Sequence, residues 1–356
     1  MFDVITIGSV TRDAFFEVPR FKTVPWKKTP SKKGFVLPLG EKLEVERIFF
    51  TLGGNSANAA VTFSQLGFRT ACMGKVGNDA GGREIRRRLD EEGVDTSMLV
   101  KTDKLATAYS VLLLKGGERT ILSYHGASNL FGLKDTDASQ LRTKWWYLSL
   151  SGESVKHFGE FMSFARKNKI AVAFNPSGYH LRHRRKDILK HLKDISFLVL
   201  NEEEAAILSG VPFSKERLVF KKLDALMPGI LAVTNGNKGA TVSDGRFVYK
   251  AGIFKEKKLA DRTGAGDAFG AAFTAGLMVS GIGRSNIAKV TGKQVVHALR
   301  LASANATSVI EKLGATEGVL SKTGFQNPRW KNLKIKIEKI LAPIWKAYRE
   351  YSVWTG

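Results

Sequence analysis

Six short apolar runs, spread over the first 234 residues, constrain the fold of this chain more than any other feature. Each is four to six residues long, and segments with helical character lie between them. Short apolar runs that alternate with helices are typical of parallel strands buried on both faces of a sheet. The runs are residues 4–7, 70–73, 145–150, 171–175, 197–200 and 230–234, and the helical segments include residues 83–92, 155–167, 202–208 and 268–279. The sequence therefore predicts an α/β fold with a parallel sheet and helical crossovers.

Residues 15–50 and 107–124 do not follow this alternation. Within the second stretch, two β-type runs, residues 109–114 and 120–124, flank a glycine pair and predict a β-hairpin. Within the first, residues 20–33 carry six basic residues and no acidic residue, with prolines interspersed. We expect this segment to be a flexible insertion.

A run of small residues, Gly264-Ala265-Gly266, precedes Asp267 and then an apolar helix. Because these residues have little or no side chain, their N–H groups can approach an oxyanion closely, and the start of the helix adds a partial positive charge. Asp267 would lie in the first helical turn, within reach of a hydroxyl beside the bound anion. The segment thus predicts an anion hole with a proton acceptor, which is what phosphoryl transfer requires.

A second glycine pair, Gly53-Gly54, also leads into an apolar helix, which we expect to end near Leu66. Asn55 and Asn58 are three residues apart, so both amides project from one face of its first turn. Amides in this arrangement suit the hydroxyls of a polyol.

Together these two segments resemble the ribokinase family of sugar and nucleoside kinases, also called the PfkB family. The resemblance extends to Gly8-Ser9 with Asp13, to residues 74–82, to Asn201-Glu202-Glu203-Glu204 and to the turn at residues 234–239, in the order of the family. It spans about residues 1–320. It implies a ribokinase-like three-layer sandwich, with a mostly parallel central sheet flanked by helices, and a small β lid formed by about residues 13–50 and 104–126.

The resemblance also implies roles for individual residues. Asp267 would be the catalytic base, beside an anion hole of Gly264, Ala265 and Gly266. The implied substrate-binding residues are Asp13, Gly53, Gly54, Asn55 and Asn58, and the implied nucleotide-binding residues are Asn201, Glu204, Thr234, Gly236, Asn237 and Gly239. ATP and Mg²⁺ are the implied cofactors, with Glu204 acting on the ion through water. A potassium site is implied at Asp261 and Thr263, next to the loop around Gly314.

We therefore expect an ATP-dependent carbohydrate kinase that transfers the γ-phosphate to a hydroxymethyl group of a sugar or sugar derivative. A nucleoside kinase of the same family is the first alternative, because Tyr109 could stack on a nucleobase as readily as on a sugar face. Ribokinases carry an acidic residue where this chain has residues 149–152, Ser-Leu-Ser-Gly, which argues against ribose itself. Fructose, a ketodeoxy sugar acid, a sugar phosphate and a nucleoside stay open. The P-loop motif of other kinases is absent from the sequence.

Composition agrees with a large globular enzyme, since the 356 residues are 43% hydrophobic. Cys72 is the only cysteine, which excludes an intramolecular disulfide, and it lies in a strand-like run where we expect it to be buried. No stretch of about 18 apolar residues occurs, and the N-terminus enters a strand directly. We expect a soluble cytoplasmic protein with no membrane partner.

The formal net charge is +23, and the excess is concentrated at residues 20–33, at residues 182–193 and in a basic, aromatic C-terminal extension, residues 321–356. The sequence contains no recognisable nucleic-acid-binding module, so we interpret these basic clusters as solvated surface. A nucleic-acid-associated protein, or a non-catalytic sugar or nucleotide sensor, is the second alternative. Apolar residues at 333–345 predict an amphipathic helix docked on the body. The resemblance further implies a homodimer in which the lids pair.

Overall fold

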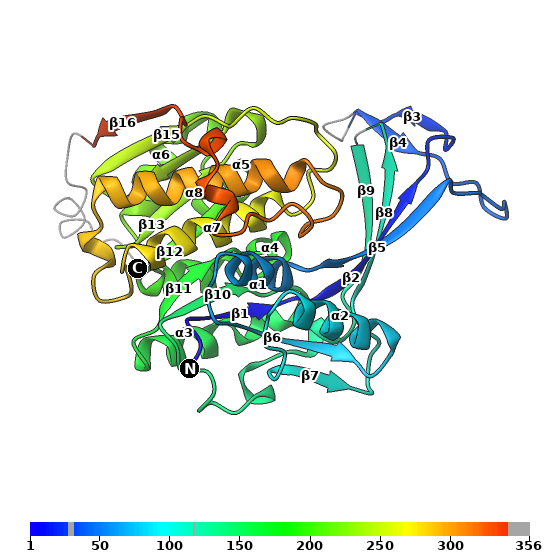
Figure 1. Cartoon of the computed structure of the whole chain (residues 1–356), viewed down its shortest axis with the longest axis horizontal. Helices are drawn as coiled ribbons and strands as arrows, with labels where there is room; N and C mark the ends of the chain where they lie inside the picture. The colour runs from blue at the N-terminus through cyan, green and yellow to red at the C-terminus, as the bar shows by residue number, and fades with distance from the viewer. Residues whose placement is uncertain (28–31, 117, 341–356) are drawn as a thin grey trace, which may run out of the picture.

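Ten strands form the central sheet of the computed structural model, which describes residues 1–27, 32–116 and 118–340 (Figure 1). Their order is β16 (Ile335–Lys339), β15 (Phe247–Ala251), β14 (Ala240–Ser243), β13 (Ile230–Thr234), β12 (Phe197–Asn201), β11 (Ala171–Phe174), β10 (Trp145–Ser149), β1 (Val4–Gly8), β6 (Thr70–Gly77) and β7 (Leu99–Thr102). The seven strands from β13 to β7 are parallel, and β14, β15 and β16 are antiparallel. All six predicted strands are present, so the mostly parallel sheet is confirmed.

Helices cover both faces of this sheet. One face carries α3 (Phe158–Lys167), α4 (Gly178–His191), α5 (Glu202–Ser209) and α6 (Glu216–Asp224), and the other carries α1 (Asn55–Gln65), α2 (Ala80–Glu91), α7 (Ala265–Val279) and α8 (Gly292–Ile310). The six predicted strands serve both layers, as in β13, where Leu231 and Val233 face α6 while Ile230 and Ala232 face α7. Strands buried on both faces need continuous apolar sequence, which is why the six runs were recognisable. Short 3₁₀ helices occupy Gly126–Leu130, Leu133–Asp135, Gly152–His157, Leu192–Asp194, Phe213–Lys215, Gly236–Lys238, Ile287–Lys289, Gly324–Gln326 and Pro328–Trp330.

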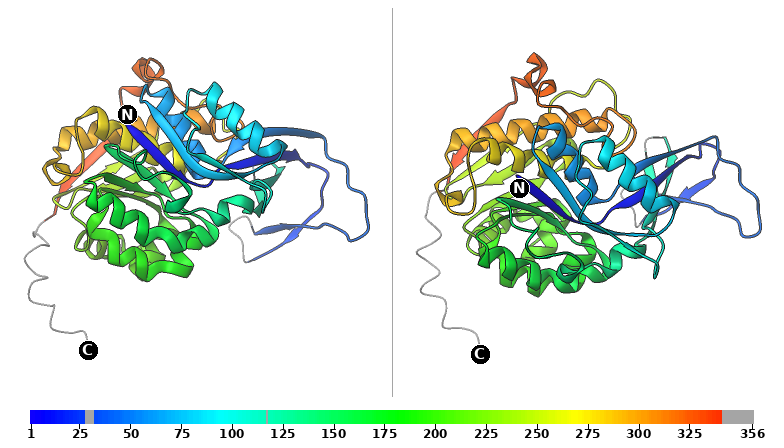
Figure 2. Two further views of the ribbon diagram at one scale, coloured as in Figure 1. Left: turned by 90° about the horizontal axis from the view of Figure 1, so that it is seen from below. Right: turned by 60° about the horizontal axis from the view of Figure 1, so that its bottom comes forward.

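A separate four-stranded sheet projects from one end of this body (Figure 2). Its order is β5 (Arg47–Gly53), β2 (Thr11–Glu17), β8 (Tyr109–Lys115) and β9 (Glu118–Tyr124), so the hairpin predicted near residue 116 is confirmed. Where it is described, the insertion at residues 20–33 contributes to a small hairpin of β3 (Thr23–Pro25) and β4 (Lys33–Phe35). Residues 28–31 lie outside the described residues.

The prediction of a C-terminal helix is wrong for residues 335–339. These residues form β16 and pair with β15 at the sheet edge. Leu333 and Ile335 pack against the core under α8, whereas Ile337 is half-exposed. Apolar residues at every second position fit a strand as well as they fit one side of a helix, and the free edge of β15 decides between the two. Residues 341–356, including the rest of the predicted helix, lie outside the described residues.

Strand order reverses between β10 and β1, because the chain proceeds outward from β1 to β6 and in the opposite direction from β10 to β13. In open α/β sheets such a reversal opens a crevice at the carboxyl ends of the strands, where ligands bind. The four-stranded sheet of β5, β2, β8 and β9, which corresponds to the predicted lid, continues from β1 at this same edge, since β2 begins three residues after β1 ends. None of the described helices combines the length and the apolar character needed to cross a membrane.

Candidate active site

Helix α7 begins at the glycine-bearing turn, with Gly264 as its N-cap. Gly264 has a φ of 76°, and a Cβ atom added there would lie 2.4 Å from the Cβ of Ala315, so a side chain is excluded both by conformation and by space. By contrast, a Cβ added at Gly266 would meet no atom within 4 Å. The first N–H groups of α7 have no acceptor within the helix, and that of Ala265 makes only a long contact of 3.5 Å with the Arg262 oxygen. The turn therefore has the geometry of an anion site.

Asp267 lies in the first turn of α7, and two amides hold its carboxylate. Asn58 donates from Nδ2 to Oδ2 at 2.9 Å, and Asn175 donates from Nδ2 to Oδ1 at 3.1 Å. Desolvation by the surrounding protein raises the pKa of Asp267 to about 6, while the two amide hydrogen bonds oppose that shift. The two glycine segments, 209 residues apart at this contact, are thus joined through Asp267.

Asn175 was missed as a site residue by sequence reasoning. It follows β11 directly, at the carboxyl edge of the sheet. A polar residue immediately after a buried strand is a usable signal, but nothing local showed that Asn175 would face Asp267.

Asp13 lies against the second glycine pair. A Cβ atom at Gly53 would be 2.1 Å from Oδ2 of Asp13, so glycine is required for the carboxylate to fit. Gly54, the N-cap of α1, has a φ of 90° and passes close to the backbone of Ser9. Burial raises the pKa of Asp13 to about 6, and repulsion from Asp267 and Asp261 adds to the shift. The predicted first turn, glycine pair and base therefore meet in one place.

Three buried polar atoms in this region have no hydrogen-bond partner in the described structure: Oδ1 of Asp13, Oδ1 of Asn58 and Oγ1 of Thr51. Thr51 is the cross-strand neighbour of Asp13 in the lid. Buried acceptors without partners cost free energy, and they cluster where a ligand supplies the missing donors. Hydroxyl groups of a bound molecule would satisfy all three atoms.

A short hydrogen-bond chain connects the amide of Asn55, the other predicted substrate-binding asparagine, to the carboxyl edge of the sheet. Asn55 donates to Oγ of Ser149 at 3.0 Å, and Ser149 donates to the backbone oxygen of Asn175 at 2.7 Å. Ser149 belongs to residues 149–152, the segment where the resemblance to ribokinases would imply an acidic residue and this sequence has none. A neutral hydroxyl therefore stands beside Asn55.

Asn201 and Glu204 form a reciprocal cap at the start of α5. The Asn201 side chain accepts from the Glu204 N–H at 2.9 Å, and Oε2 of Glu204 accepts from the Asn201 N–H at 2.8 Å. Burial raises the pKa of Glu204 to about 7, and repulsion from Asp267 contributes. A desolvated carboxylate of this kind fits a position close to a divalent cation, which would lower its pKa again.

The turn at residues 234–239 joins β13 to β14 at the same edge, because Thr234 is the register partner of Asn201. Gly239 has a φ of 93°, and a Cβ atom there would lie 2.0 Å from the backbone oxygen of Ala251. Gly236 and Asn237 are exposed in the 3₁₀ turn. The structure thus brings the two predicted nucleotide segments together.

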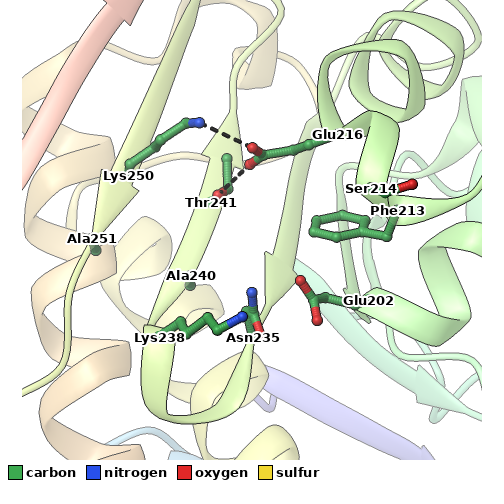
Figure 3. A pocket seen from close by; sticks show the side chains of 10 residues that line it. All are labelled: Glu202, Phe213, Ser214, Glu216, Asn235, Lys238, Ala240, Thr241, Lys250 and Ala251. Carbon is green, nitrogen blue, oxygen red and sulfur yellow. Dashed lines mark hydrogen bonds and ion pairs between the residues drawn. The ribbon is translucent and has the colours of Figure 1, made fainter.

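A cavity of about 420 Å³ lies beside this turn (Figure 3). Asn235 and Lys238 line it on one side, and Phe213 and Glu202 face them. At its far end Glu216 accepts hydrogen bonds from Thr241 at 2.8 Å and from Lys250 at 3.0 Å. Asp267 and the turn of α7 do not line this cavity, so it is distinct from the place where the glycine segments meet.

One oxygen of the Asp261 carboxylate stabilises the turn before α7. Oδ1 accepts from the backbone N–H of Thr263 at 3.0 Å and from its hydroxyl at 2.8 Å. Oδ2 is buried without a partner in the described structure. The loop that follows Gly314 lies against Gly264, so its carbonyl groups are close by. An unpartnered carboxylate oxygen beside backbone carbonyls suits a cation.

The expectation that Tyr109 faces the substrate is wrong. In the register of β2 and β8, Tyr109 pairs with Arg12 and Ser110 pairs with Asp13. Neighbouring residues of a strand point to opposite faces, so Tyr109 lies on the face away from Asp13, with its ring 5.7 Å from the Arg12 guanidinium.

Comparison with known proteins agrees with this geometry. The family model described as pfkB family carbohydrate kinase matches residues 3–322. The 5-dehydro-2-deoxygluconokinase of Shouchella clausii is 28% identical over 285 residues, which cover 75% of this chain and 83% of that protein. The structure of Arabidopsis thaliana ribokinase with ribose and ATP shares the fold with a TM-score of 0.73 at 22% identity, covering 93% of this chain and 99% of that one. An E. coli structure solved with ATP and Mg²⁺ has a TM-score of 0.73 at 19% identity, covering 92% of this chain and 98% of that one.

A match over nine-tenths of the chain establishes the family, so this protein belongs to the pfkB family of carbohydrate kinases. It is an ATP-dependent phosphotransferase, and the ribokinase-like fold expected from the motifs is confirmed.

Proposed function

We propose that this enzyme transfers the γ-phosphate of ATP to a hydroxymethyl group of an uncharged sugar or sugar derivative, with Asp267 as the general base. The observation that carries the proposal is the position of Asp267, which lies in the first turn of α7 and is bonded to Asn58 of the second glycine segment. Base, anion turn and acceptor-binding residues are thereby within one region. The raised pKa of Asp267 keeps the carboxylate basic enough to accept a proton near neutral pH.

In the proposed reaction, the acceptor hydroxymethyl group is held by Asp13, Gly54, Asn55 and Asn58 and points at Asp267. Asp267 accepts the hydroxyl proton as the oxygen attacks the γ-phosphorus, and ADP leaves. The N–H groups of Gly264, Ala265 and Gly266 stabilise the charge on the transferred group. Closure of the lid over the acceptor would keep water away from ATP.

On the nucleotide side, Asn201 and Glu204 would order Mg²⁺ through its water molecules, and Thr234, Gly236, Asn237 and Gly239 would contact the phosphates and ribose. Held there, the ion would supply positive charge to offset that of the phosphates. The raised pKa of Glu204 and the register position of Asn201 beside Thr234 support this assignment.

The polar groups that surround the acceptor position favour a neutral polyol. They are a carboxylate, two asparagine amides and hydroxyls, with unpartnered acceptor atoms on Asp13, Asn58 and Thr51. Such acceptors bind hydroxyl donors and repel anions. A sugar phosphate or sugar acid would bring a further negative charge to a site whose proposed binding residues, Asp13, Gly54, Asn55 and Asn58, include a carboxylate and no cation. A nucleoside is the second candidate, because its ribose offers the same hydroxyls.

An ADP-release screen with ATP and Mg²⁺ tests the proposal across neutral sugars, sugar acids, sugar phosphates and nucleosides. We expect turnover to depend on the acceptor and to be fastest with a neutral sugar. ADP release at the same rate without any acceptor, or preference for an anionic sugar, would contradict the proposed acceptor class. The Asp13→Asn variant provides the matched control, since it should raise KM for the acceptor more than KM for ATP.

We also propose that K⁺ binds at Asp261 and Thr263, beside the loop that follows Gly314. The unpartnered Oδ2 of Asp261 supports this site. Turnover should be severalfold faster in KCl than in tetramethylammonium chloride at equal ionic strength, and the Asp261→Asn variant should lose this difference. Equal rates in K⁺, Na⁺ and the organic cation would exclude potassium activation.

A further inference from the structure

We propose that Asn175 is a positioning residue for Asp267, and that the amides of Asn58 and Asn175 together clamp the two oxygens of this carboxylate. The inference rests on the proposed function and adds a residue to it. Oδ1 of Asp267 accepts from Asn175 at 3.1 Å, and Oδ2 accepts from Asn58 at 2.9 Å. One amide comes from the first turn of α1 and the other from the loop after β11, so the carboxylate is held by two separate elements.

The clamp is uncharged. In the part of the chain that the structure describes, the groups hydrogen-bonded to the Asp267 carboxylate are amides, and no Lys or Arg forms an ion pair with it. A cation there would stabilise the ionised carboxylate and weaken it as a base. Neutral donors orient the carboxylate while leaving it able to take up a proton.

Asn175 is itself fixed by β10. Its backbone N–H donates to the Leu148 oxygen at 3.0 Å, and its backbone oxygen accepts from Ser149 at 2.7 Å. The side-chain nitrogen Nδ2 of Asn175, which donates to Asp267, also lies 3.3 Å from the hydroxyl of Tyr147, which is completely buried and packs under Gly270 of α7. The side chain therefore has little freedom to leave Asp267 when the acceptor enters.

The two amides differ in what else they face. Oδ1 of Asn58 is buried without a partner, so Asn58 is also available to an acceptor hydroxyl. In the described structure, the side-chain amide nitrogen of Asn175 instead donates to Asp267 and Tyr147. Loss of the Asn175 amide should therefore lower kcat and leave KM for both substrates nearly unchanged.

Proton affinity gives a second consequence. The negative charge of Asp267 raises the pKa of three ionisable groups around it: Asp13 in the lid, Glu204 at the start of α5 and Tyr147 in β10. Asp261, in the turn before α7, also raises the pKa of Asp13. Desolvation disfavours a negative charge on Asp267 and raises its pKa, and the two amides oppose that shift. Without one amide, protonation of Asp267 should move to higher pH by about one unit, and the acid limb of kcat should move with it.

The test compares the full-length enzyme with Asn175→Leu, which keeps the side-chain volume without its donor, and Asn175→Asp, which replaces the donor by a negative charge. Asn168→Ala is the control, because Asn168 caps α3 and lies before β11, at the end of the strand opposite to Asn175. We expect kcat to fall about tenfold to a hundredfold in Asn175→Leu, and further in Asn175→Asp, with the acid limb shifted upward. Asn168→Ala should retain wild-type kcat and pH profile.

A carboxyl ¹³C NMR titration, with the Asp267 resonance assigned by its loss in Asp267→Asn, measures the same shift without any substrate. If the wild-type enzyme phosphorylates no acceptor, the proposed function fails, and the titration alone decides whether the clamp exists. A lower melting temperature in Asn175→Leu, with kcat per folded enzyme, acid limb and Asp267 titration unchanged, would show a purely structural role and overturn the proposal.

Discussion

At the scale of single residues, the buried carboxylates fall into two kinds. Asp267, Asp13 and Glu204 have raised pKa values and meet at the carboxyl edge of the sheet, where a ligand can compensate them. Asp224 is also buried and its pKa is raised to about 7, but it lies at the end of α6, far from that edge. Perturbed carboxylates indicate function only when a cleft and other functional groups accompany them.

Asp224 gives a prediction about stability. Its Oδ2 accepts from Ser243 at 2.6 Å, whereas Oδ1 is buried without a partner. The pKa of Asp224 is higher in the folded state than in the unfolded chain. Ionisation of Asp224 therefore lowers the free energy of unfolding as pH rises from about 4 to about 7. Asp224→Asn should therefore raise the free energy of unfolding by about 1–3 kcal/mol at pH 8 and change it little at pH 4.

Urea denaturation at both pH values measures this difference. Asp187→Asn serves as the control, since Asp187 is half-exposed in α4. A gain at pH 4 as large as that at pH 8 would contradict the account of Asp224.

The positions of candidate site residues could be predicted from sequence when the residues belonged to a local pattern. Asp267 and the glycine pair followed from small residues that precede a helix. Asn175 did not, because its contact with Asp267 spans 92 residues and depends on how two crossovers converge. Tyr109 was misassigned because a shift of one position in the strand places a side chain on the other face.

At the scale of elements, strands buried on both faces were predicted well and helix starts less well. Helix α2 begins at Ala80 rather than at residue 83, because Asp79 caps it by accepting from the Gly82 N–H at 2.8 Å. The same Asp79 accepts from the Thr107 N–H at 2.8 Å and so fixes the entry to the lid. That double role depends on tertiary contacts, which local periodicity does not contain.

Strand β16 can be tested by comparing two of its isoleucines. Ile335 packs against the core under α8, and Ile337 is 51% exposed. Ile335→Asp should lower the free energy of unfolding by about 1–3 kcal/mol, because a charge would replace buried apolar surface. Ile337→Asp should cost much less, and kcat should stay at the wild-type value in both variants.

Thermal unfolding and turnover of the two variants provide the measurement. Equal destabilisation by both substitutions would be inconsistent with the inward orientation of Ile335.

At the scale of the whole molecule, the lid presents an apolar outer face. Ile48, Leu122 and Tyr124 share this face with Phe50 and are each about half-exposed, and every residue of β9 is exposed. An exposed apolar sheet face with an uncovered edge strand is typical of an interface. We propose that two copies of the chain associate through their lids.

Sedimentation analysis at micromolar concentration should show a dimer that Leu122→Glu dissociates. Val279→Glu is a matched control, because Val279 is 65% exposed at the end of α7 and lies outside the lid. A monomeric wild-type protein, or equal dissociation by both substitutions, would exclude the lid interface.

The central claim is that Asp267 removes the proton from the acceptor hydroxyl at the start of α7. Its most direct test is the steady-state turnover of Asp267→Asn with the acceptor that the ADP-release screen identifies. The substitution preserves shape but removes the basic oxygen, so kcat should fall by about a hundredfold or more while KM for ATP and for the acceptor change little. A kcat within a few-fold of the wild-type value would contradict the role of Asp267 as base.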